Sequence, residues 1–220
     1  MISMLSHPEL RARAEVLYGE LLSLDVEGSD GSVVEIGLQC TGMCEAMRPA
    51  VHGLWTFLAD EEAAIVANAH SAAAERLQML DEAGRFTHDA VLPLAQRLLL
   101  LCDRILQEAV PRIVSSSDFS ESEVRALLLL DDDAHLREYV CSTAITSADH
   151  LLRNAGRAPL DEVLETLVYM GADISSAMSG GVAGATPADA HLVVAASRRL
   201  AACAGALLGI SIHLLASCDA

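Results

Sequence analysis

Three side chains suited to acid–base chemistry recur at helical spacing in the middle of the chain: Asp131, His135 and Glu138. Steps of four and three residues place them on one face of a helix. A carboxylate beside a histidine can orient the imidazole as a general base, and the same group can bind a metal. We therefore predict catalytic roles for all three. The alternative is an acidic helix start, in which aspartates cap the helix and interact with its dipole.

A second polar line comprises Thr41, Glu45, Arg48 and His52. Pro49 lies within it, and a proline inside a helix favours a kink. A kink close to Trp55 would form one wall of a polar pocket, so we predict that Glu45 and His52 are catalytic. Arg48 and Trp55 are then expected to bind the substrate, Arg48 through an anionic group. A solvated helix face is the alternative interpretation.

Sulfur-bearing residues follow the same segment, again at steps of three and four: Cys40, Met43, Cys44 and Met47. Such ligands suit Cu(I), but they are also ordinary core residues, and we predict the core. A carboxylate di-iron bundle needs two Glu-x-x-His motifs, whereas this chain offers only Asp132-x-x-His135. A di-iron or copper-binding bundle is therefore the lesser alternative, and we predict no metal and no organic cofactor.

The composition excludes several classes of protein. All 14 basic residues are arginine, so Schiff-base and P-loop lysines are ruled out. The net charge of −17 repels nucleic-acid phosphates and anionic lipids, and we expect neither nucleic acid nor membrane as a partner. Arginine in place of lysine, together with abundant alanine, suggests a GC-rich bacterial genome, in which natural-product pathways are common.

Helix starts can be located because a serine followed three residues later by glutamate forms a capping box. The chain has such boxes at Ser6, Ser32 and Ser120. The acidic stretch of residues 25–32 should end the first helix. Gly84 is expected to end another, and a new helix should run from Thr87 to just before Pro111. The acidic step at residues 131–133 either ends one helix or begins the next, which should close at Gly156.

These elements predict an all-α fold, a single-domain bundle of seven to eight helices over residues 1–220. Aromatic residues are only 3% of the chain, so the core must be aliphatic. The apolar segment 200–218 is nearly long enough to span a bilayer, but it contains His213 and several serines, which favours a central buried helix. Gly205 and Gly209 would let another helix approach closely, within the bundle or across a dimer.

Function follows less directly from these patterns. We expect a small enzyme or enzyme subunit of bacterial natural-product metabolism, using carboxylate and histidine groups for a proton transfer or a cyclisation of a small-molecule substrate. The alternative is a non-catalytic accessory protein that stabilises a partner, because no complete catalytic motif is present and the surface is acidic. The six cysteines form no CxxC pair and no signal peptide is evident, so we expect reduced thiols and a cytoplasmic location, with a partner protein or homodimer as the assembly.

Overall fold

The computed structural model describes residues 5–24, 31–47, 81–116, 120–123, 133–153 and 190–218. Within these ranges the chain is helical except for short helix ends, and no strand occurs. The labelled elements are α1 (His7–Ser23), η1 (Thr87–Val91), α4 (Leu92–Ser116), α6 (Asp133–Arg153) and α8 (Ala190–Cys218). Residues 33–47, 81–86 and 121–123 are helical as well. The all-α prediction is confirmed, while the helix count and the single domain stay predictions.

The three predicted capping boxes are present. In each box the glutamate carboxylate accepts hydrogen bonds from the backbone N–H and the hydroxyl of the serine: Ser6–Glu9, Ser32–Glu35 and Ser120–Glu123. These hydrogen bonds hold the pKa of each glutamate below its usual value. Local sequence therefore fixes where these helices begin. α6 spans Asp133–Arg153, so the last residue of the acidic step is helical, while residues 131 and 132 lie outside the described residues.

The predicted break between Gly84 and Thr87 is wrong, because the chain stays helical from residue 81 to residue 116. Instead, residues Thr87–Val91 form one π-helical turn, in which the Leu92 N–H donates to the Thr87 carbonyl. In a regular α-helix the ring of Pro93 would clash with the carbonyl four residues earlier, and the wider π turn relieves that clash.

The predicted helix end before Pro111 is also wrong, since α4 continues to Ser116. Pro111 removes a single backbone hydrogen bond near the end of the helix. Val110 is buried and Val114 packs against the core, so apolar contacts on both sides of the proline hold the last turns in place.

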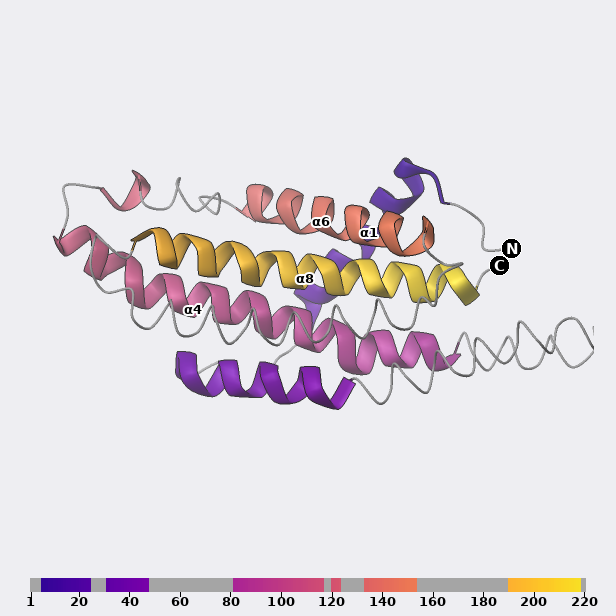
Figure 1. The fold of residues 1–220 in the computed structure, drawn as a ribbon, viewed down its shortest axis with the longest axis horizontal. Coiled ribbons are helices and arrows are strands. Elements are labelled where there is room, and N and C mark those ends of the chain that lie inside the picture. Colours follow the sequence, from indigo (N-terminus) through magenta and orange to yellow (C-terminus); the bar gives the residue numbers. More distant parts are fainter. Residues whose placement is uncertain are drawn as a thin grey trace, which may run out of the picture.

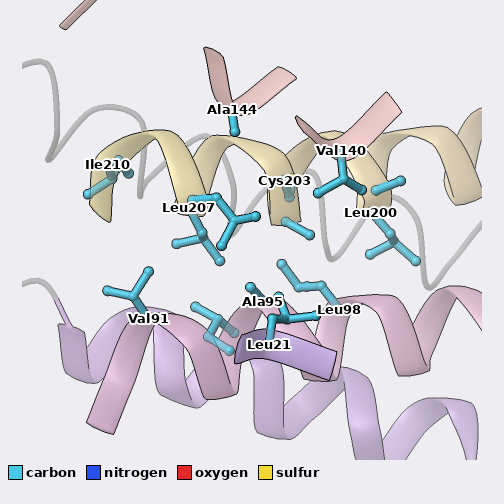
Figure 2. Close-up of a cluster of buried hydrophobic side chains, with 14 of the residues drawn as sticks. Leu21, Val91, Ala95, Leu98, Val140, Ala144, Leu200, Cys203, Leu207 and Ile210 are labelled. Atoms are coloured by element: carbon cyan, nitrogen blue, oxygen red, sulfur yellow. The ribbon is translucent and has the colours of Figure 1, made fainter. Parts of the chain in front are cut away.

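α8 is the central helix of the described part of the chain. It contacts α1, η1, α4 and α6, and Figure 1 shows it between α4 and α6. Its segment Ala195–Ala216 is long and apolar enough to cross a membrane, yet 78% of an apolar 18-residue stretch within it is buried inside the structure. In Figure 2, side chains of α8 such as Leu200 and Leu207 lie between those of α4 and those of α6.

Gly205 and Gly209 explain how α6 packs so closely on α8. A Cβ atom at position 205 would lie 2.7 Å from both the Thr143 Cβ and the Val140 carbonyl oxygen. At position 209 it would lie 2.6 Å from the Ser147 Cβ and 2.8 Å from the carbonyl oxygen of residue 144. The glycine spacing therefore serves packing between helices of one chain, the first of the two uses predicted for it.

Candidate functional site

The residues of the polar line around Pro49 lie partly within the described structure. Glu45 is exposed on the helix of residues 33–47, whereas Arg48, His52 and Trp55 lie outside the described residues. A hydrogen bond from Arg97 of α4 to Gln39 joins this helix to α4. In Figure 1 the helix lies on the side of α4 that faces away from α8.

The predicted acid–base group of Asp131, His135 and Glu138 lies on α6, apart from Asp131, which is outside the described residues. His135 is exposed. Glu138 accepts two hydrogen bonds of 2.9 Å from Arg11 of α1 and one of 3.0 Å from Ser142. The bond from Arg11, followed by that from Ser142, lowers the pKa of Glu138 to about 2. Glu138 thus joins α6 to α1.

The two predicted groups do not meet on the described part of the chain. α6 lies on one side of α8, and the helix that carries Glu45 lies beyond α4 on the other side (Figure 1). A site shared by Glu45, His135 and Glu138 is therefore not formed by the described residues.

The sulfur-bearing residues are core residues, as predicted. Cys40, Cys44 and Met47 are buried and Met43 packs against the core. Desolvation raises the pKa of the Cys40 and Cys102 thiols to about 12, so neither is a reactive thiolate at neutral pH. Among the described residues, no group of three or more histidine, cysteine, aspartate or glutamate side chains is arranged to hold a metal ion.

A cavity of about 300 Å³ lies between α1, η1 and α8. Leu17 and Ile212, both buried in the core, form part of its lining. Ala12, Val16 and Leu215 add further apolar surface, and Val16 is 60% exposed. The polar groups on the wall come from separate elements: Arg13, Glu20 and His88. An apolar pocket with a few polar groups is the usual form of a small-molecule site, and this volume is at the lower end of their range of about 300–1,000 Å³.

Glu20 and His88 form the chemical feature of this cavity. The His88 Nδ1 lies 3.9 Å from the Glu20 Oε2, within ion-pair distance when the imidazole is protonated. His88 is placed there by η1, the π turn that precedes Pro93, and π turns in helices often occur at functional sites. The pair therefore joins a base and an acid from two elements that are 68 positions apart in the chain.

One oxygen of this pair has no hydrogen-bond donor among the described residues. The Glu20 Oε2 is buried although the side chain as a whole is 42% exposed, and it accepts no hydrogen bond. The hydroxyl of Thr87, next to His88 in η1, is also buried without a hydrogen-bond partner in the described structure. Buried polar atoms of this kind are uncommon in folded proteins and call for a physical explanation.

The residues of this site were not predicted from the sequence, in which the more prominent line along α1 consists of its buried residues Leu10, Ala14, Leu17 and Leu21. Ala12, Val16 and Glu20 form a second line on the helix at steps of four residues, two apolar side chains followed by an acid. This line of residues is the sequence feature that could have indicated the cavity. His88 gives no comparable signal, because its position beside Glu20 depends on how the helices pack.

Comparisons with protein-family models, with curated proteins and with solved structures found no match to this chain.

Proposed function

We propose that this chain is a small helical enzyme, or a subunit of one, that binds a small molecule between α1, η1 and α8 and transfers a proton with His88 and Glu20. The observation that carries the proposal is the imidazole and carboxylate, 3.9 Å apart, on the wall of a largely apolar cavity. A role in bacterial natural-product metabolism belongs to the same proposal and rests on composition alone.

In the proposed reaction, the neutral imidazole of His88 removes a proton from a carbon next to a carbonyl group of the bound molecule. The electron pair of the broken C–H bond moves to the carbonyl oxygen, and the imidazolium returns the proton to another atom of the same molecule. The result is an isomerisation that needs no co-reactant. Glu20 stabilises the imidazolium by its negative charge, and such catalytic contacts commonly shorten when substrate binds.

The site differs from the one predicted from sequence. None of the described predicted residues, Glu45, His135 and Glu138, lines this cavity. Their catalytic roles, with those of His52 and Asp131, stay predictions, as do the substrate-binding roles of Arg48 and Trp55.

The proposal is tested by hydrogen exchange in D₂O, which detects proton removal before any natural substrate is identified. Short aliphatic ketones, with and without an amino group, are incubated with the protein, and the loss of their α-proton NMR signals is followed. Because general base catalysis contributes about 10²–10⁴-fold, His88→Gln should lower the exchange rate by at least about 10²-fold. His150→Gln, which alters an exposed histidine on α6, is the matched control and should keep the wild-type rate.

Two results would contradict the proposal. One is exchange that stays at the buffer rate with every ketone. The other is exchange that survives His88→Gln but is lost in His135→Gln, which would favour the acid–base group on α6 instead.

A second candidate function, an accessory protein for another subunit, is favoured by a separate observation. Val34 and Leu38 are 52% and 62% exposed and lie four residues apart, on one face of the helix of residues 33–47. Because two chains of charge −17 repel each other, a different protein, with a basic rim around an apolar groove, fits this face better than a second copy.

This second candidate predicts a defined change in assembly. Purified alone, the chain should be monomeric, and co-expression with the product of an adjacent gene should give a stable complex of fixed stoichiometry by size-exclusion chromatography with light scattering. Val34→Glu with Leu38→Glu should abolish that complex, whereas Leu22→Glu, at a similarly exposed leucine on α1, should retain it. A complex that survives the double change would exclude this face.

A further inference from the structure

The Glu20 carboxylate indicates what kind of group the cavity binds. Its side chain lines the cavity and is 42% exposed, so a ligand in the cavity can reach it. The His88 Nδ1 at 3.9 Å is too distant for a hydrogen bond to the Oε2. A ligand that brings a positively charged N–H donor to this carboxylate forms a charge-assisted hydrogen bond with it.

The order of side chains along α1 places this carboxylate at one end of an apolar wall. Ala12, Val16 and Glu20 succeed each other at steps of four residues, which corresponds to about 6 Å per step along the helix. Arg13 lies seven residues before Glu20 and interacts electrostatically with Glu9, at the start of the helix. Along the helix, the cationic Arg13 is therefore about two turns away from Glu20.

The walls between these two ends are hydrocarbon. Val16 and Leu17 of α1 line the cavity together with Ile212 and Leu215 of α8. When a straight aliphatic chain packs along this wall, the apolar surfaces of the chain and of the wall are both removed from water, which favours binding. The net charge of −17 also raises the local concentration of cations, whatever their shape.

We propose that the cavity between α1, η1 and α8 binds an aliphatic ammonium compound, with its ammonium group at the Glu20 carboxylate and its hydrocarbon chain against Val16 and Ile212. This inference rests on the proposed function and names its substrate class. A substrate of this class carries its amino group at one end and presents a more central carbon to His88.

The test is a pair of calorimetric titrations of the full chain, with hexylammonium chloride as the cationic probe and hexan-1-ol as its neutral counterpart. Glu20→Gln should weaken the binding of hexylammonium by at least about tenfold and leave the binding of hexan-1-ol unchanged. Glu15→Gln is the matched control, because Glu15 lies on the same helix with a side chain exposed to 43%, close to the 42% of Glu20. The Glu15→Gln substitution removes the same charge. Because Glu15 pairs with Arg137 of α6, its replacement should leave the binding of both probes unchanged.

A second pair of variants tests the cavity itself. Val16→Trp fills it, whereas Leu22→Trp adds the same ring at an equally exposed position on α1 outside the lining. Val16→Trp should abolish the binding of both probes, and Leu22→Trp should not affect it. Circular dichroism confirms that each variant is folded.

The outcomes separate the two proposals. If both probes bind equally well and Glu20→Gln changes neither, the ammonium class is wrong while the cavity remains a binding site. If neither probe binds, or Val16→Trp leaves their binding unchanged, then the cavity is not a binding site and the proposed function fails with it.

Discussion

Glu138 and Glu20 are both carboxylates on the surface of a helix, but their neighbours give them different chemistry. Glu138 accepts hydrogen bonds from Arg11 and Ser142, which stabilise its charged form and lower its pKa to about 2. The Oε2 of Glu20 accepts none among the described residues. Its residue type and spacing made Glu138 a candidate catalytic residue, yet in the structure its carboxylate joins α6 to α1.

His213 gives a prediction about acid stability at the residue scale. It is fully buried in α8, and desolvation lowers its pKa from 6.5 to about 4. The unfolded chain therefore binds this proton below pH 6.5, while the folded chain binds it only near pH 4, so stability falls as the pH is lowered through that interval. Between pH 7 and pH 4.5 the loss from this residue should be roughly 2–3 kcal/mol.

Urea unfolding of wild type and His213→Gln at both pH values measures this effect. The variant should lose less unfolding free energy than wild type over the interval, by roughly that amount. An equal loss in both proteins would show that His213 does not titrate as its burial implies.

At the scale of the elements, the contact between α6 and α8 leaves no room for an added Cβ atom at its glycines. Gly209→Ala places a methyl group 2.6 Å from the Ser147 Cβ and should lower the free energy of unfolding by about 1–3 kcal/mol. Gly19→Ala is the matched control. Its Cβ meets nothing within 4 Å on α1, so the better helix propensity of alanine should raise stability by about 0.5–1 kcal/mol. Chemical denaturation gives both values, and a Gly209→Ala variant as stable as wild type would contradict the packing.

Sequence predicted helix starts better than helix continuations. Ser6, Ser32 and Ser120 cap helices through contacts within four residues, so local sequence contains the whole signal. Gly84 and Pro111 look like helix ends by the same local rules, but the helix continues through both. Packing against α8 and the π turn before Pro93 override these local preferences, and neither is visible in a local pattern.

At the scale of the whole molecule, composition predicted the class of fold and the nature of the core. Few aromatic residues and many alanine and leucine residues imply helices packed through aliphatic side chains, and Figure 2 shows such a core. The cavity could not be predicted in this way. It depends on α1, η1 and α8 meeting in space, and nothing in the spacing of Glu20 and His88 requires them to meet.

The central claim is that small molecules bind beside His88, and the imidazole NMR signals of the histidines test it most directly. During a titration with hexylammonium chloride, the signal of His88 should shift and reach saturation, while those of His135 and His150 on α6 should stay in place. A titration in which His135 shifts and His88 does not would contradict the account and would place the site on α6.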